Sequence, residues 1–384
     1  MNDNPMESYK KNPMYAYLMV LVICASAGLQ GWMALFTNFA KEVVGVNGFE
    51  LGVVQGVREI PGFLTFVVVY LLLVMKEHRL SAWSVVVLGI GIGATGFFTS
   101  FTGLLATTVV MSVGFHYFET TNKSLTVQHF DQTDAPIVFA RLRGYGALAN
   151  IAVGIAVWLL SYLISYRMNF LLLGLFIALA GIVMLARDPG EGRGLPEQNS
   201  LVLRRRYGLY YVLNFLSGAR RQIYIVFAVF LLVERYGLGV GTVAGIYVVN
   251  YALTFLTNRW ISRAINIHGE RVVLSLESGS LFLLFLGYAF IESVWVAVAL
   301  FVLDSIFFNF SIGLSTYLQK TADSADLAQS TAVGYTINHI SAVIIPLIGG
   351  SLWLVSWRLP FIIGAGLTLV SLYFTQKIRT DRHG

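Results

Sequence analysis

Three arginines lie inside long apolar stretches of the sequence, where a charged side chain is costly. Arg58 falls in the stretch 50–75, and Arg220 and Arg221 fall in the stretch 207–233. A guanidinium stays charged at physiological pH, so in such surroundings it must be paired or hydrated. Guanidinium groups also bind carboxylates and phosphates through two parallel hydrogen bonds. The three arginines therefore predict a clamp for an anionic solute.

Carboxylates in the same kind of stretch offer a competing interpretation. Glu59, Glu119 and Asp304 equal the arginines in number, so internal ion pairs could neutralise all three. The two interpretations are compatible, because a substrate anion can displace an internal one. Desolvated carboxyl and imidazole groups can also exchange protons near neutral pH. The candidate proton-coupling residues are Glu59, Glu119, Asp304, His116 and His339, with a packing role left open for the histidines.

Neutral polar side chains accompany the arginines at helical spacing. Asn214, Arg221 and Tyr224 are separated by seven and three residues, which places them on one helix face. Polar residues inside a membrane usually face a bundle interior or a water-filled cavity. The predicted substrate-binding residues are Arg58, Arg220, Arg221, Asn214, Tyr224, Asn309 and Asn338.

Composition identifies the surroundings of these residues as lipid. The chain has 384 residues, of which 57% are hydrophobic and 12% charged, with a mean hydropathy of +0.72. Ordinary soluble domains are roughly 25% charged, so a soluble enzyme is excluded. Apolar windows of about 20 residues, the length that spans a bilayer, recur along the chain. They cover residues 14–37, 50–75, 83–101, 103–122, 141–164, 168–186, 207–233, 239–260, 272–291, 293–318, 330–354 and 358–377.

These windows predict an all-α membrane protein with twelve transmembrane helices. In lipid each spanning segment must satisfy its own backbone hydrogen bonds, and the windows lack the alternation of barrel strands. Of the 26 Lys and Arg, nineteen fall in alternate segments that include both termini, and four fall in the intervening loops. Positive residues concentrate on the cytoplasmic side, so both termini are expected in the cytoplasm, with the protein in the plasma membrane.

The chain divides into two predicted halves. Residues 187–206 are rich in Gly, Pro and charge and follow the sixth window. They predict a cytoplasmic linker between six-helix bundles at 1–186 and 207–384. A weak repeat supports pseudo-symmetry, because Gly144-Tyr145 and Gly334-Tyr335 are each followed by an Asn at a similar depth.

This organisation resembles the Major Facilitator Superfamily over the whole chain. That family often has a Gly-x-x-x-Asp-Arg-x-Gly-Arg/Lys-Arg/Lys loop after its second and eighth helices. Here Gly269 and Arg271 match that pattern after the window 239–260, whereas Asn266 and Ile267 replace its Asp and Arg. The resemblance implies alternating access around a midplane site, with Gly269 and Arg271 in a gating loop.

The resulting hypothesis is a secondary active transporter, a symporter or antiporter. It would move a small organic solute, anionic in character, across the cytoplasmic membrane with proton coupling. Its partners would be a small-molecule substrate, protons and the lipid bilayer. The chain is expected to be a monomer that binds no nucleic acid. Two alternatives remain: a multidrug or metabolite exporter of the same fold, and a non-transporting membrane sensor or lipid-handling scaffold.

Catalytic and cofactor motifs are missing from the sequence. It has no Ser/His/Asp set, no HExxH motif and a single cysteine, so no catalytic residue, metal site or cofactor is predicted. The run Gly89-x-Gly91-x-Gly93 mimics a phosphate-binding loop but follows no strand. Small residues of this kind let membrane helices approach closely, which is the role we expect.

Overall fold

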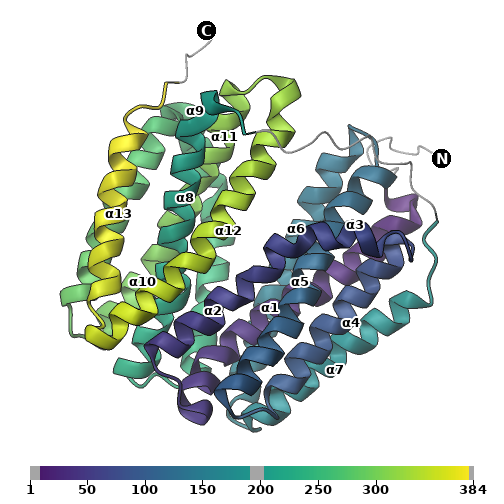
Figure 1. Cartoon of the computed structure of the whole chain (residues 1–384), viewed down its shortest axis with the longest axis horizontal. Coiled ribbons are helices and arrows are strands. Elements are labelled where there is room, and N and C mark those ends of the chain that lie inside the picture. The colour runs from purple at the N-terminus through teal and green to yellow at the C-terminus, as the bar shows by residue number, and fades with distance from the viewer. Residues whose placement is uncertain (1–8, 191–202, 380–384) are drawn as a thin grey trace. The chain divides into compact units, whose positions relative to one another are not determined.

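The computed structural model describes residues 9–190 and 203–379, and no strand occurs among them (Figure 1). The described residues form two compact units. The first unit contains residues 9–44, 60–190 and 240–248, and the second contains residues 45–59, 203–239 and 249–379. The chain therefore changes unit inside two of its helices, after Glu59 and after Val248.

The helices of the first unit are long, apart from the short α3. They are α1 (Pro13–Phe39), α3 (Val67–Leu71), α4 (Glu77–Thr95), α5 (Phe101–His129), α6 (Asp134–Leu160) and α7 (Tyr166–Leu185). A π-helical turn at Ala40–Val44 extends α1.

The second unit carries the remaining helices, with α2 and α9 each divided between the two units. They are α2 (Gly48–Phe63), α8 (Gly208–Gln222), α9 (Val240–Phe290), α10 (Val294–Phe308), α11 (Ile312–Thr321), α12 (Ser324–Val355) and α13 (Leu359–Thr375). Shorter helical turns lie at Arg205–Tyr207, Ile223–Ala228, Leu231–Arg235 and Asn309–Ser311.

Ten described helical segments are long and apolar enough to cross a membrane. They are Pro13–Val44, Gly48–Leu71, Phe101–His129, Asp134–Leu160, Tyr166–Leu185, Arg205–Arg235, Val240–Thr257, Arg259–Phe290, Val294–Thr321 and Gln329–Val355. The apolar helix Leu359–Thr375 is shorter, and α4 is not among the ten although it covers much of the window 83–101. The multi-pass helical prediction is thus confirmed, whereas the count of twelve stays a prediction.

Two helices differ locally from the expected windows. The window 50–75 is interrupted by a 3₁₀ turn at Leu64–Phe66, shortly after Pro61, which cannot donate a backbone hydrogen bond. The expected gating loop with Gly269 and Arg271 is instead helical up to Gly269, whose φ of 78° and ψ of 164° break α9. Glycine adopts this positive φ without the strain that a Cβ would impose.

Only the ends of the predicted linker 187–206 can be placed, because residues 191–202 lie outside the described residues. At its beginning, the Asp188 carboxylate accepts a hydrogen bond from the Gly190 backbone N–H at 3.0 Å. This hydrogen bond holds the pKa of the Asp188 carboxyl below its usual value.

Close helix packing in the first unit depends on glycine. A Cβ on Gly91 of α4 would lie 2.3 Å from the backbone nitrogen of Met111 on α5. A Cβ on Gly89 would lie 2.5 Å from the backbone nitrogen of Ala178 on α7. The expected role of this glycine run is confirmed at both positions, since α4 contacts the backbones of two neighbours where it has no side chain.

We expect Gly91→Ala to destabilise the protein by about 1–3 kcal/mol, the usual cost of overpacking. Gly144→Ala is the matched control, because Gly144 lies in α6 and a Cβ there meets nothing within 4 Å. The control should be neutral or stabilising by up to about 1 kcal/mol through helix propensity. Thermal unfolding in detergent compares the two, and equal melting temperatures would contradict the packing described.

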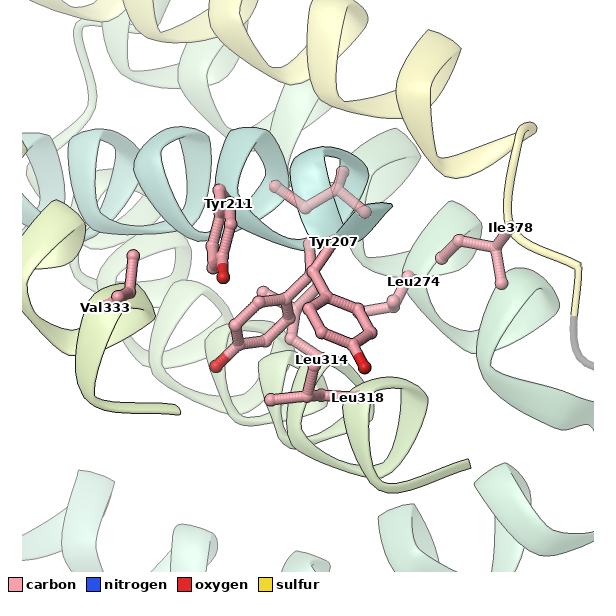
Figure 2. Packing of buried hydrophobic residues seen from close by; sticks show 9 residues of the cluster. Tyr207, Tyr211, Leu274, Leu314, Leu318, Val333 and Ile378 are labelled. Carbon is pink, nitrogen blue, oxygen red and sulfur yellow. The ribbon is translucent and has the colours of Figure 1, made fainter. Parts of the chain in front are cut away.

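Buried apolar side chains of the second unit pack together in one cluster (Figure 2). Its buried members are Tyr207, Tyr210, Tyr211, Leu213, Leu274, Leu314, Leu318, Val333 and Ile378. These residues come from the turn Arg205–Tyr207 and the adjoining start of α8, from α9, α11 and α12, and from the segment after α13. The cluster therefore joins five parts of the chain that are distant in sequence.

Charged residues at the end of the predicted linker pair beside this cluster. The Arg206 guanidinium donates to Asp323 and Asp326, and Arg204 lies 3.3 Å from Asp326. Burial alone would raise the pKa of the Asp326 carboxyl, but the hydrogen bond from Arg206 and the two positive charges lower it below its usual value.

Asp326 should therefore stabilise the fold at neutral pH and lose this contribution as the pH falls. A lowered pKa means that the unfolded chain takes up the proton first, at about pH 4. We expect acidification to lower the melting temperature of the wild-type protein more than that of Asp326→Asn. Asp323→Asn, which removes the more exposed carboxylate, serves as control. Parallel pH profiles for wild type and Asp326→Asn would refute this contribution.

Candidate functional site

The predicted site residues divide between the two units. All the predicted substrate-binding residues lie in the second unit, together with Glu59, Asp304, His339, Gly269 and Arg271. His116 and Glu119 lie in the first unit. The second unit by itself thus contains most of the predicted side chains.

Arg220 of α8 points into the interior of the second unit. Its side chain is buried, and one guanidinium nitrogen lies 3.3 Å from the Glu277 carboxylate on α9. The same guanidinium donates to the Leu216 carbonyl at 3.3 Å and to the Ser278 hydroxyl at 3.5 Å. Arg220 is therefore internally paired. Its partner, Glu277, was not among the candidate residues predicted from the sequence.

Arg221 has different surroundings, because consecutive residues on a helix project about 100° apart. Its side chain is half-buried, and its Nε is buried without a hydrogen-bond partner. No carboxylate among the described residues forms an ion pair with it. α8 changes to a π-helical turn at Ile223, two residues later, and such turns are frequent at functional sites.

Neutral polar groups connect α8 with its neighbours. The Asn338 amide of α12 donates to the Asn214 carbonyl at 3.4 Å, and Asn214 itself donates to the Tyr210 carbonyl. The Tyr224 hydroxyl accepts from the Asn250 amide of α9 at 3.0 Å. The predicted face of α8 therefore packs against polar side chains of α9 and α12. Asn250 was not among the predicted site residues, although it lies in an apolar window.

Asn309 lies at a break in a membrane-spanning segment. It begins the 3₁₀ turn Asn309–Ser311 between α10 and α11. Its amide donates to the Thr254 hydroxyl of α9 at 3.1 Å and to the Ser305 carbonyl at 2.6 Å. A 3₁₀ turn inside a longer helix often marks a hinge.

A second buried cluster contains Arg58, Glu59 and His339. Arg58 lies 2.6 Å from one Glu59 carboxylate oxygen, and the other oxygen lies 3.1 Å from His339 Nδ1. Arg58 thus shows the internal pairing with Glu59 that the sequence left open. The cluster lies where α2 and α12 approach closely, since a Cβ on Gly52 would lie 2.1 Å from the Pro346 carbonyl oxygen.

The remaining predicted residues lie apart from these clusters. Glu119 forms an ion pair with Lys123, one helical turn later, at 2.9 Å. His116 is buried in α5, and its backbone carbonyl accepts from the Thr120 hydroxyl. Arg271 donates to the Gln376 side chain after α13 at 3.1 and 3.2 Å.

Glu270, the residue before Arg271, forms an ion pair in the same region. The buried Glu270 carboxylate lies 2.7 Å from the Lys320 ammonium of α11. The predicted gating loop is therefore joined to α11 and to the end of α13. Within the described residues no group of three or more His, Cys, Asp or Glu side chains could hold a metal ion.

Comparison with known proteins agrees with this architecture. Residues 18–346 match the model of the Major Facilitator Superfamily. No curated protein sequence matches the chain. A variant of the nucleoside transporter NupG shares its fold with a TM-score of 0.78 at 15% identity, covering 95% of this chain and 99% of that one.

Two further solved structures share the fold. A bacterial homologue of the human lysosomal transporter Spinster superposes with a TM-score of 0.73 at 13% identity, covering 98% of this chain and 97% of that one. A bacterial homologue of the iron transporter ferroportin gives 0.74 at 13% identity, covering 96% and 98%. The match over residues 18–346 and the shared fold lead to one conclusion: the chain belongs to the Major Facilitator Superfamily and is a multi-pass membrane transporter.

Proposed function

We propose that this transporter moves a small organic anion across the plasma membrane by proton-coupled alternating access, as a monomer with both termini in the cytoplasm. The observation that carries the proposal is Arg221, a half-buried cation with no carboxylate partner among the described residues. An arginine in apolar surroundings keeps its charge and needs an anion or water. A carboxylate or phosphate on the substrate would meet that need.

Polar groups on α8 and on other helices of the second unit suit recognition of such a solute. Asn214, Tyr224 and Asn338 offer amide and hydroxyl groups from α8, its π-helical extension and α12. Asn309 adds an amide at the break between α10 and α11. Arg58 and Arg220 are held by Glu59 and Glu277, so a substrate would contact their guanidinium groups only after displacing a carboxylate.

Proton coupling is the second part of the proposal. Glu59 and His339 share a close contact at 3.1 Å, and Asp304 is buried in a segment that is long and apolar enough to cross a membrane. Each can gain or lose a proton, which is the minimum that coupling requires. His116 and Glu119 are the corresponding candidates in the first unit.

Uptake into proteoliposomes tests the proposal. A series of radiolabelled carboxylates and phosphorylated metabolites would be offered with an imposed pH gradient, and neutral analogues of the same size serve as controls. We expect accumulation of at least one anion, abolished when an ionophore collapses the gradient. Gradient-independent flux would contradict coupling, and transport of neutral analogues alone would contradict the anion. No flux of any solute would favour a sensor or scaffold.

A further inference from the structure

A charge cluster inside the second unit contains more carboxylates than cations. Arg220 on α8, Glu277 on α9 and Asp304 on α10 are 3%, 0% and 1% exposed. Arg220 lies 3.3 Å from Glu277, and Asp304 interacts electrostatically with both. If all three groups were ionised, the cluster would carry one uncompensated negative charge in the buried interior of the unit.

Within residues 9–190 and 203–379, Arg220 is the only cation that interacts with Glu277 or Asp304. The other titratable group that interacts with the cluster is the hydroxyl of Tyr288 on α9, which in turn interacts with the Tyr224 hydroxyl on the turn after α8. The neutral hydroxyls of Ser278 on α9 and Ser371 on α13 complete the polar contacts. One oxygen of each carboxylate, Glu277 Oε2 and Asp304 Oδ2, is buried with no hydrogen-bond partner.

We propose that Glu277 and Asp304 share one proton-binding site, with Arg220 as its fixed counter-ion, and that this site carries the coupling proton. Binding converts one carboxylate into a carboxylic acid, leaving one anion beside one cation and a neutral cluster. Release restores the buried negative charge. Because the two carboxylates interact, the proton belongs to the pair and not to one residue. This inference rests on the proposed proton coupling and identifies the group responsible.

A proton fits the site better than a metal ion. The two carboxylates lie beside a guanidinium that is itself positive, which repels a metal cation. Neither this cluster nor any other in the described part of the chain offers three carboxylate, imidazole or thiolate ligands. A proton needs only one oxygen and no coordination shell.

Infrared difference spectroscopy of the purified protein in detergent tests the site without any substrate. Lowering the pH should produce the C=O band of a buried carboxylic acid in the wild-type protein. Glu277→Gln and Asp304→Asn should each lose this band, because each leaves one carboxylate balanced by Arg220. Glu292→Gln, at a side chain that is 69% exposed, should retain the band. Arg220→Gln should roughly double it, because both remaining carboxyls must then be protonated.

The outcomes separate the site from the transport proposal. Retention of the band in both carboxylate variants would overturn the shared site. So would a shift of the titration midpoint when sodium replaces choline at constant ionic strength, which would indicate a metal cation. If one variant does not fold, the other decides, and Arg220→Gln gives an independent result. A band that behaves as expected in a protein without gradient-driven flux would leave the proton site intact and reject only its role in coupling.

Discussion

Replacing Arg220 by methionine is expected to destabilise the protein by about 3–5 kcal/mol, because it removes the single cation of a buried charge cluster. Glu277 and Asp304 would then both have to take up a proton or remain as unpaired charges. The loss in the free energy of unfolding should grow as the pH rises, because the unfolded chain releases these two protons more readily than the folded protein does. Equilibrium unfolding in mixed detergent micelles at two pH values measures both effects.

Matched variants separate loss of charge from loss of shape. Arg220→Lys keeps a cation and should recover part of the stability, although lysine lacks the planar donors that reach Leu216 and Ser278. The triple variant Arg220→Met, Glu277→Gln, Asp304→Asn carries no buried charge and should be more stable than Arg220→Met alone. If Arg220→Met unfolds like the wild-type protein at both pH values, the cluster does not need its arginine.

Arg221→Ala, one position along the same helix, should instead act on substrate affinity. Hydrogen bonds between charged groups contribute about 1.5–3 kcal/mol, so affinity for an anionic substrate should fall roughly 10- to 100-fold. Stability should change little, because no carboxylate in the described part of the chain depends on this side chain. Binding isotherms for an anion identified by the uptake screen measure the loss.

Two controls sharpen the Arg221 result. Arg221→Lys should retain intermediate affinity, because lysine keeps the charge without the bidentate geometry. Arg235→Ala removes a more exposed arginine 3.6 Å from Glu292 and should leave affinity unchanged. Unaltered affinity in Arg221→Ala would exclude the anion clamp at this position.

These two adjacent arginines illustrate which features could be predicted from the sequence and which could not. Composition and window length sufficed to predict a helical membrane protein, because a backbone in lipid must satisfy its own hydrogen bonds and few structures do so. The arginines were recognisable as unusual for the same reason. Arg58 could be linked to Glu59 because the two are adjacent in sequence.

The partner of Arg220 could not be predicted from residues close to it in the sequence. Glu277 is 57 residues away, near the predicted end of another helix, and only the packing of α8 against α9 brings it within 3.3 Å. The count of three arginines and three carboxylates omitted it, although a glutamate inside an apolar window was the available signal. The break of α9 at Gly269 and the assignment of the start of α2 to the second unit likewise depend on tertiary contacts.

The central claim is that substrate binding and proton binding use different side chains of the second unit. Counterflow exchange in proteoliposomes without a pH gradient tests it most directly, with gradient-driven accumulation measured in the same preparation. We expect Asp304→Asn to keep exchange and lose accumulation, and Arg221→Ala to lose both at low substrate concentration. Full accumulation by Asp304→Asn, or normal exchange by Arg221→Ala, would contradict this division of roles.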